Sequence, residues 1–254
     1  MRIISLGWGV QSFTLAAMAA LGELEPVDYA IHADTGFESV LTYDFAERWW
    51  MWLRDRGVMV VTVNEPNARI IINRGGGKIY IPAFTESNKG AGGMLRRQCT
   101  QHWKIAPIRR FIQSQRKGQP VDMLLGISTD EWQRMKDSDV KYIRNVYPLI
   151  EKKMSRLDCV NWIKTHGLEV PAKSACYFCP FHSTSEWNRV KQTSDWKLVT
   201  AVDEQIRYAR PSELGLRLYL HPSLKPIDEV DFRSAEEKGQ MTLWDSECSG
   251  ICGV

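Results

Sequence analysis

Hydrophobic and polar positions alternate in blocks along the first half of the chain, and the blocks have the lengths of strands and helices. Short apolar, β-branched runs predict strands over residues 1–6, 27–32, 58–63 and 121–127, and the nearly pure β-branched run 58–63 indicates a fully buried strand. Apolar residues recur at helical spacing over residues 13–21, 40–56 and 105–116. Because strands that alternate with helices form parallel sheets, we expect an α/β fold with an open, mostly parallel sheet and helices on both faces.

The remaining segments interrupt this alternation. The Gly-rich stretch 73–93 predicts a loop that contains a short strand at 78–81. Residues 147–150 indicate an exposed turn before a helix at 156–166, and the chain from about Leu168 has little strand signal. We therefore expect an α/β domain over residues 1–150 and a smaller, helical or irregular cysteine-containing region over residues 151–254.

Composition indicates a soluble intracellular protein. The chain has 254 residues, of which 44% are hydrophobic and 25% charged, as is ordinary for a globular protein. No apolar run reaches the roughly 18 residues of a membrane span, and the first residues do not form a signal peptide, so we expect a cytoplasmic location. Six cysteines are too sparse for a disulfide scaffold, which favours metal, cluster or redox chemistry.

The net charge of +3 says little, but its distribution is uneven. Between Glu86 and Asp122 there is no acidic residue, whereas there are eight basic ones: Lys89, Arg96, Arg97, Lys104, Arg109, Arg110, Arg116 and Lys117. Such a segment favours the phosphates of a nucleotide or a nucleic acid. Trp103 lies within it and could stack on a base or be partly buried. The alternative for the whole segment is a solvated helix face.

The segment between the first strand and the first helix has the composition of a phosphate-binding loop. Its glycines allow close backbone approach, its serine hydroxyls can donate to oxygens, and the following helix offers free N–H groups. The candidate nucleotide-binding residues are Ser5, Gly7, Trp8, Gly9, Gln11 and Ser12. Asp34 ends the second strand, where we expect it near a ribose or a magnesium ion. The alternative is an ordinary tight turn, since neither a Walker loop nor a dinucleotide fingerprint is present.

Two pairs of cysteines are spaced as metal ligands. Cys176 and Cys179 form a C-x-x-C, and Cys248 and Cys252 form a C-x-x-x-C near the end of the chain. Together they could hold zinc through four thiolates. Cys159 lies within a predicted helix and is expected to be a buried core thiol, and His182 is either a further ligand or structural.

Several segments resemble, in order, the PP-loop ATP pyrophosphatases, and among them the phosphoadenosine phosphosulfate reductase-like branch. The segment 5–12 is similar to the SGGxDS loop, and 32–38 to the branch's DTG motif. Residues 97–107, 126–134, 147–149 and 176–180 are similar to its Cys-then-Lys-x-x-Pro, Gly-x-Arg-x-x-Glu, Tyr-Pro-Leu and C-x-x-C-Pro segments. This resemblance implies an adenine nucleotide alpha hydrolase-like fold, Gly126 at the nucleotide, and catalytic roles for Lys104, Asp34 and Arg134.

The sequence also departs from the family. Gln11 stands where the loop usually has Asp, Val10 where Lys is common, and Trp8 where Gly is usual. The reductases end in Glu-Cys-Gly-x-His, but this chain ends in residues 247–254 without that motif. In cluster-binding members a similar cysteine set holds a [4Fe–4S] cluster, which here would be Cys99, Cys176 and Cys179 completed by Cys248 or Cys252. Thiolates suit iron–sulfur and zinc alike, so both remain open, as do free or redox cysteines.

Three functions are consistent with these features. The first, similar to iron–sulfur nucleic-acid thiolation enzymes, is adenylation by ATP–Mg²⁺ of a nucleobase in RNA or DNA, followed by sulfur transfer from an unidentified donor, with AMP and pyrophosphate released. Lys104, Arg109 and Arg110 would stabilise pyrophosphate or acceptor phosphates. The second is a sulfonucleotide (adenylyl sulfate) reductase. The third is a nucleotide-binding protein with structural zinc. The sequence leaves open whether the chain forms a homodimer.

Overall fold

The computed structural model describes residues 1–66, 68, 70–72, 78–86, 92–209 and 217–233. The chain forms two compact units: residues 1–66 and 101–175 make the first, and residues 67–100 with the chain from Cys176 onward make the second. This division differs from the boundary predicted at residue 150. The segment 67–100 leaves the first unit because it pairs with later residues, and residues 151–175 stay because they pack on the first helix.

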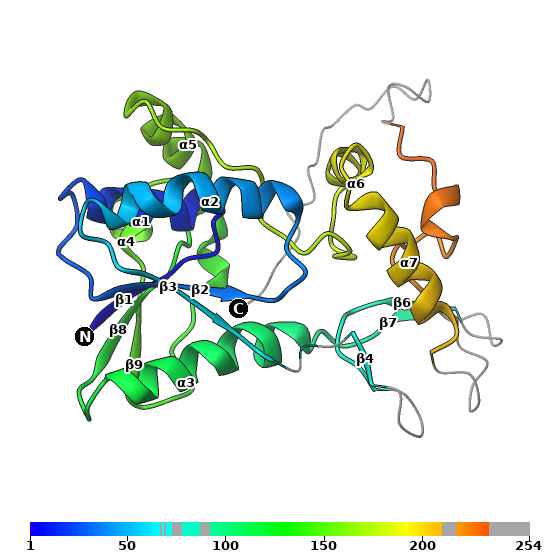
Figure 1. Cartoon of the computed structure of the whole chain (residues 1–254), viewed down its shortest axis with the longest axis horizontal. Coiled ribbons are helices and arrows are strands. Elements are labelled where there is room, and N and C mark those ends of the chain that lie inside the picture. The colour runs from blue at the N-terminus through cyan, green and yellow to red at the C-terminus, as the bar shows by residue number, and fades with distance from the viewer. Residues whose placement is uncertain (67, 69, 73–77, 87–91, 210–216, 234–254) are drawn as a thin grey trace. The chain divides into compact units, whose positions relative to one another are not determined.

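The first unit is built on a five-stranded sheet in which every neighbouring pair is parallel. Its order is β3-β2-β1-β8-β9, formed by Val60–Asn64, Tyr29–Asp34, Arg2–Ser5, Val121–Leu124 and Ile143–Val146 (Figure 1). The predicted open parallel α/β sheet is therefore confirmed. The chain reverses its direction of travel across the sheet between β1 and β8, which creates a topological switch point there.

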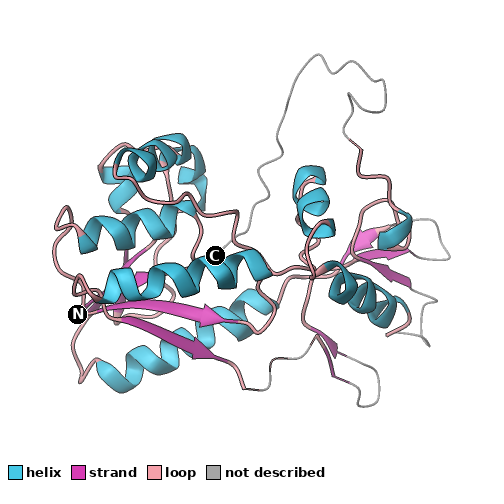
Figure 2. Cartoon of the chain, turned by 45° about the horizontal axis from the view of Figure 1, so that its top comes forward, coloured by secondary structure: helices cyan, strands magenta, loops and turns pink. Residues whose placement is uncertain are grey.

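Helices cover both faces of this sheet (Figures 1 and 2). One face carries α1 (Val10–Ala20), α2 (Val40–Arg54), α4 (Pro148–Glu151) and α5 (Arg156–Thr165), and the other carries α3 (Ala106–Gln115). A π-helix, η1 (Thr100–Ile105), leads into α3, whose Pro107 lies in the first turn as predicted.

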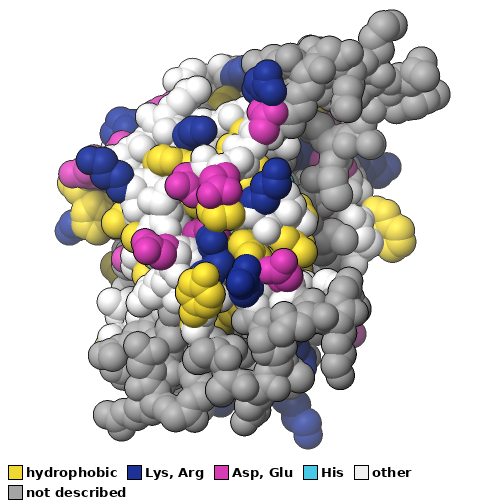
Figure 3. All heavy atoms as spheres, turned by 90° about the vertical axis from the view of Figure 1, so that its right-hand side faces the viewer, with side chains coloured by type: hydrophobic (Ala, Val, Ile, Leu, Met, Phe, Trp, Pro, Cys, Tyr) yellow, Lys and Arg dark blue, Asp and Glu magenta, His cyan; other side chains and the backbone are white. Residues whose placement is uncertain are grey.

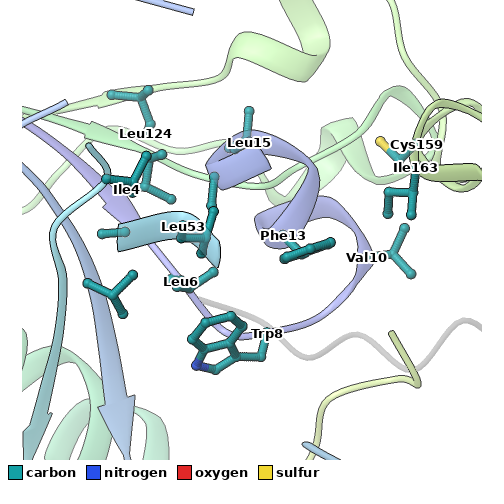
Figure 4. Packing of buried hydrophobic residues seen from close by; sticks show 14 of the residues in the cluster. Ile4, Leu6, Trp8, Val10, Phe13, Leu15, Leu53, Leu124, Cys159 and Ile163 are labelled. Carbon is teal, nitrogen blue, oxygen red and sulfur yellow. The ribbon is translucent and has the colours of Figure 1, made fainter. Parts of the chain in front are cut away.

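The larger core lies between the sheet and α1, α2 and α5. Phe13 and Leu15 of α1 are completely buried, and Phe13 makes an edge contact with Phe45 at 4.8 Å between ring centroids (Figure 4). Cys159 of α5 is also completely buried in this cluster, and burial raises the pKa of its thiol to about 11. Its predicted role as a core thiol is confirmed, and a thiol with so high a pKa is a poor nucleophile.

Two predictions about the first unit are wrong. The run 58–63 was expected to be a fully buried strand, but β3 is the edge of the sheet and its side chains alternate between buried and exposed. Residues 147–150 were expected to be an exposed turn, but Pro148 starts α4 and Leu149 is completely buried under α1. The β-branched composition of 58–63 indicated burial, but the strand order places β3 at the edge. The Tyr-Pro sequence at 147–148 indicated a turn, but packing against α1 buries Leu149.

The second unit contains a small antiparallel sheet that the sequence did not predict. Strand β6 (Phe84–Glu86) lies between β7 (Gly93–Met94) and β10 (Arg217–Tyr219). A separate hairpin pairs β4 (Ile71–Ile72) with β5 (Lys78–Ile79), within the predicted strand at 78–81. Strands of two or three residues are too short to show a period-two pattern, so β4, β6, β7 and β10 were missed. Residues 73–77 and 87–91 of the Gly-rich stretch lie outside the described part.

The described part of this unit also contains the helices α6 (Thr184–Lys191) and α7 (Trp196–Arg207) and the 3-10 turn η3 (Ile227–Glu229). In the described part of the chain, no helix has the length and apolar character that crossing a lipid bilayer requires.

Asp203 of α7 holds the second unit together. Its side chain is almost fully buried, accepts hydrogen bonds from the N–H groups of Leu220 and Ile227, both at 3.0 Å, and pairs with Arg207 one helical turn on. One carboxylate thus joins the helix to β10 and to η3. Burial raises the pKa of Asp203, while the two N–H donors and Arg207 oppose that rise.

We predict that Asp203→Ala lowers the free energy of unfolding by about 1–3 kcal/mol, because two buried N–H groups lose their acceptor. Asp228 is exposed and lies in η3 beside Ile227, so Asp228→Ala should keep a free energy of unfolding within about 0.5 kcal/mol of the wild type. Urea denaturation of both variants measures the difference, and equal midpoints would show that Asp203 does not hold these elements.

Candidate functional site

The predicted phosphate loop lies at the switch point of the sheet. It connects the carboxyl end of β1 to the start of α1, next to the strand β8 that lies on the other side of β1. Open α/β sheets bind ligands in the crevice outside the carboxyl ends of their strands at such a point. The position of Ser5, Gly7, Gly9 and Ser12 is therefore that of a ligand-binding loop.

Ser12 ties this loop together. Its Oγ accepts a hydrogen bond from the N–H of Gly7 at 3.1 Å and donates one to the carbonyl of Gly9 at 3.2 Å. Gly9 is the N-cap of α1, and no side chain caps this helix end. Since the first N–H groups of a helix have no partner within the helix, those of α1 can donate to an anion, and the helix dipole favours negative charge there.

Gly126 fits against the loop because it has no side chain. A Cβ at this position would lie 2.7 Å from the backbone nitrogen of Ser12 and 2.9 Å from the carbonyl carbon of Gln11. Backbone atoms of a helix start cannot yield to such a contact. Gly126 was predicted to lie at the nucleotide. Its structural role is to let the loop after β8 pack against the start of α1.

Gln11 is fixed by a polar network from the segment after β8. Its Nε2 donates to Glu131 Oε2 at 3.2 Å and to Ser128 Oγ at 3.4 Å. Arg134, also predicted as a site residue, donates to the same carboxylate oxygen of Glu131 at 2.8 Å. Both partners of Gln11 belong to or border the 3-10 helix η2 (Thr129–Arg134). The neutral side-chain amide of Gln11, which stands where the family usually has Asp, thus links the loop to η2.

Asp34 ends β2, as predicted, and is held by two donors. The N–H of Gly36 donates to its Oδ1 at 2.8 Å, and the hydroxyl of Tyr43 donates to the same oxygen at 2.7 Å. Burial raises the pKa of Tyr43, and the hydrogen bond to Asp34 adds to the rise, so Tyr43 remains a donor at any physiological pH. Asp34 is therefore an oriented carboxylate at the carboxyl edge of the sheet.

Lys104 lies beside a carboxylate that sequence reasoning did not single out. Its Nζ is 2.9 Å from Oε1 of Glu38, whose side chain is only 1% exposed. The hydroxyl of Thr35 donates to the same oxygen at 3.4 Å. Glu38 lies two residues after the Asp34-Thr35-Gly36 segment, and this proximity was the signal available in the sequence. The ion pair with the buried Glu38 carboxylate therefore fixes the position of the Lys104 ammonium group.

A hollow of about 400 Å³ lies between β2, β3 and α2. Its lining combines aromatic, polar and aliphatic side chains: Trp8, His32, Asp34, Tyr43, Ala46, Glu47, Trp50, Met51 and Thr62. Burial lowers the pKa of His32, so its ring is neutral near pH 7, and Nδ1 lies 3.2 Å from the Leu6 carbonyl.

Trp8 was expected to stack on a base or to cover the phosphate loop. It is instead 2% exposed and packs edge-on against His32 and Phe45, with a backbone φ of +58° (Figure 4). A left-handed backbone is usual for glycine and costs other residues about 1–2 kcal/mol. The conformation turns the indole inward, so the residue that replaces the family's Gly forms part of the core and of the hollow. Trp103 is likewise 2% exposed and packs on Phe37.

The basic segment is not a continuous cationic surface in space. Acidic residues from other elements neutralise two of its arginines: Arg109 pairs with Asp139, and Arg110 pairs with Glu65. On the face drawn in Figure 3, cationic and anionic side chains also lie interspersed. Lys89 lies outside the described residues. That the segment binds a phosphate backbone stays a prediction, and the two ion pairs reduce the positive charge that Arg109 and Arg110 offer to it.

Arg116 and Arg97 of the same segment contact aromatic rings. Arg116 lies over the ring of Tyr142, with 4.4 Å between the guanidinium carbon and the ring centroid, and Arg97 lies 5.8 Å from that of Phe181.

The cysteines expected to bind metal include three described members: Cys99, Cys176 and Cys179 all belong to the second unit and are partly exposed thiols. Cys176 and Cys179 form one turn, in which the N–H of Cys179 donates to the carbonyl of Cys176 at 3.0 Å. Within the described ranges, no three His, Cys, Asp or Glu side chains are grouped as ligands of a metal ion. Cys248 and Cys252, the other two cysteines of the expected ligand set, lie outside those ranges.

His182 packs against this turn and stabilises it. Its Nε2 lies 3.1 Å from the Cys176 carbonyl, and its Nδ1 lies 3.9 Å from Glu186 Oε2. The ring also packs edge-on against Trp187 at 4.7 Å between centroids. With Nε2 engaged by the backbone, the structural role expected for His182 fits its surroundings better than a ligand role.

Neither a family model nor a curated protein matches this sequence. Among solved structures, the chain is similar to the phosphoadenylyl-sulfate (PAPS) reductase from Candida auris, determined as a phosphate complex. The match covers 67% of this chain and 74% of the reductase, with 12% identity and a TM-score of 0.43. The structure described above is that of an α/β protein with an uncapped helix start at the switch point of its parallel sheet.

We predict that Gly126→Ala destabilises the protein by about 1–3 kcal/mol and displaces the phosphate loop, because its methyl group would overlap the backbone of Ser12. Gly7→Ala should be tolerated, since a Cβ there meets only the Ser12 hydroxyl at 3.8 Å. Thermal unfolding and ATP titration calorimetry test the pair. Normal stability and normal ATP affinity in Gly126→Ala would contradict the packing role.

Proposed function

We propose that this protein is an ATP-dependent adenylating sulfurtransferase that acts on a nucleobase, free or within a nucleic acid. The observation that carries the proposal is the uncapped start of α1 at the switch point, closed by Ser12 and braced by Gly126. An anion site of this kind suits the triphosphate of a nucleotide. The PP-loop resemblance of residues 5–12 supports ATP as that nucleotide.

The reaction has two steps in this proposal. An oxygen of the acceptor attacks the α-phosphorus of ATP, the α–β phosphoanhydride bond breaks, and pyrophosphate leaves. Sulfur at the oxidation level of sulfide then attacks the activated carbon, and AMP leaves with the oxygen, so that no electrons are gained or lost. The α1 amides stabilise charge on the phosphates, and Asp34 orients the ribose or a magnesium ion.

Lys104 is the residue proposed to act on the leaving pyrophosphate. Its ammonium group is partly exposed while its partner Glu38 is buried, so the ion pair directs the cation without enclosing it. A contact to pyrophosphate would strengthen as negative charge develops on the bridging oxygen. Such a contact lowers the barrier rather than the dissociation constant of ATP.

A thiolate-bound iron–sulfur cluster, or zinc as the alternative, is proposed for the Cys176–Cys179 turn. The two cysteines belong to one hydrogen-bonded turn, a C-x-x-C spacing is typical of metal ligands, and soft thiolate ligands suit both groups. Bound there, the group would supply a place for sulfide or a structural link. Because the described residues do not assemble the remaining ligands, no step of the proposed reaction passes through it.

The proposed activity is tested with ATP and nucleic acid on one side, and with adenylyl sulfates and a thiol reductant on the other. We expect AMP formation from ATP that is stimulated by the acceptor. Lys104→Ala should lower kcat about 100-fold and change ATP affinity much less. Sulfite release without ATP would overturn the transferase and support a reductase.

The variant needs a control, because Lys104→Ala leaves the buried Glu38 without its cation. The double variant Glu38→Gln, Lys104→Ala removes that charge as well. An equal loss of kcat in both variants assigns the effect to Lys104. Recovery of kcat in the double variant would assign it to the unpaired carboxylate instead.

The metal proposal predicts that Cys176→Ser loses bound iron or zinc, whereas Cys159→Ser keeps it, since the Cys159 thiol is fully buried in the first unit. Loss of the metal should also lower thermal stability, because metal-binding energy is part of folding energy. Metal analysis of anaerobically purified protein and an absorption spectrum give the answer. Unchanged metal content in Cys176→Ser would remove this turn from the site.

A further inference from the structure

The surface beside the phosphate loop joins η2 to the turn between α4 and α5. The N–H of Thr129 donates to the carbonyl of Met154 at 2.9 Å, and the N–H of Arg156 donates to Asp130 Oδ1 at 3.0 Å. Glu131, the next residue of η2, receives the Gln11 side chain of the loop. The turn 152–156 is therefore attached to the same short helix that contacts the candidate nucleotide site.

Lys153 occupies a position in this turn that favours glycine. The N–H of Met154 donates to the Leu149 carbonyl and that of Lys153 to the Ile150 carbonyl, which is the Schellman pattern at a helix C-terminus. Lys153 accordingly has a φ of +54°. Glycine adopts this conformation without strain, whereas lysine does not. The fold therefore gains no backbone stability from having lysine at this position.

The cations of this turn have no counter-ions in the described part of the chain. Lys152 and Lys153 are exposed, Arg156 is half-buried, and none of the three forms an ion pair there. The nearby carboxylates of Asp130 and Asp158 accept hydrogen bonds from backbone N–H groups instead. This differs from α3, where Arg109 and Arg110 are paired.

An exposed aromatic side chain belongs to η2, the short helix to which this turn is hydrogen-bonded. Trp132 of η2 is 67% exposed, although it has the largest apolar surface of any residue type and sits beside a site-forming carboxylate. Exposed indoles interleaved with unpaired cations are the arrangement that binds unpaired nucleotides, since bases stack on the ring while phosphates meet the cations. A free phosphate compound would use the cations but not the ring.

We propose that the surface formed by Trp132, Lys152, Lys153 and Arg156 binds an unpaired strand of nucleic acid and holds it beside the phosphate loop. One base stacks on Trp132, and successive phosphates contact the turn. The inference rests on the proposed function in naming the acceptor of that site as a polynucleotide, but the binding itself requires no ATP.

The test is fluorescence anisotropy of labelled single-stranded 20-mers, RNA and DNA of one sequence, titrated with the full chain over a range of salt and without ATP. Trp132→Ala should weaken binding about tenfold. Lys153→Gly should weaken it at low salt and reduce the slope of log K against log salt by about 0.7. Because glycine suits this backbone, Lys153→Gly should also raise the melting temperature, so weaker binding could not be attributed to misfolding.

Two matched controls accompany these variants. Lys117 also has a left-handed backbone, with φ +45°, but lies at the end of α3, so Lys117→Gly relieves the same strain and should leave binding unchanged. Tyr208 is 65% exposed in the second unit, and Tyr208→Ala removes an equally exposed ring elsewhere.

Wild-type affinity and salt slope in both Trp132→Ala and Lys153→Gly would overturn the proposal, as would a wild type that binds neither strand. Weaker binding in Lys117→Gly alone would also overturn it and would show that the oligonucleotide binds at the end of α3. Normal oligonucleotide binding without any AMP formation from ATP would support this surface while removing the proposed transferase, so the two failures are distinguishable.

Discussion

The close approach of Gly126 to the start of α1 is the constraint on which the candidate site depends. Two loops that leave the sheet on either side of its switch point meet there at backbone distance, which only a residue without a side chain permits. The contact fixes where the free N–H groups of α1 lie relative to η2. Gln11 then reaches Glu131 and Ser128 across the same junction. Without this junction, the phosphate loop and the η2 segment would be separate surface loops.

Around the junction, charged groups are arranged by burial rather than by sequence proximity. Glu38 is enclosed by the fold and directs Lys104, while Asp34 is oriented by Tyr43 and Gly36. A buried carboxylate needs such partners because desolvation of an isolated charge is costly. The chain thus presents one directed cation and one directed carboxylate at the carboxyl edge of β2, and these are the groups to which the proposed chemistry assigns roles.

Three residues of the first unit, Trp8, Lys117 and Lys153, hold backbone conformations that favour glycine, and they differ in what the conformation achieves. Trp8 turns its indole into the core and the neighbouring hollow, so packing can offset the strain. Lys153 turns an exposed ammonium group to solvent, where no packing offsets it. Lys117 is exposed with the same strain, so the role proposed for Lys153 follows from the cations and the indole near it and not from strain alone.

The sequence by itself determined four of the five strands of the parallel sheet, the helices α1, α2, α3 and α5, and the loop between β1 and α1, because these depend on local periodicity and on the glycines and serines of one turn. It also identified Cys159 as a core thiol. It did not predict the fifth strand, β9. Only the tertiary structure decided that β3 is an edge strand, that Leu149 is buried, and that Arg109 and Arg110 are neutralised by Asp139 and Glu65. It also revealed Glu38 as the partner of Lys104 and the reason for Gly126. Each of these depends on residues far apart in the chain, whose proximity follows from strand order and cannot be seen in local pattern.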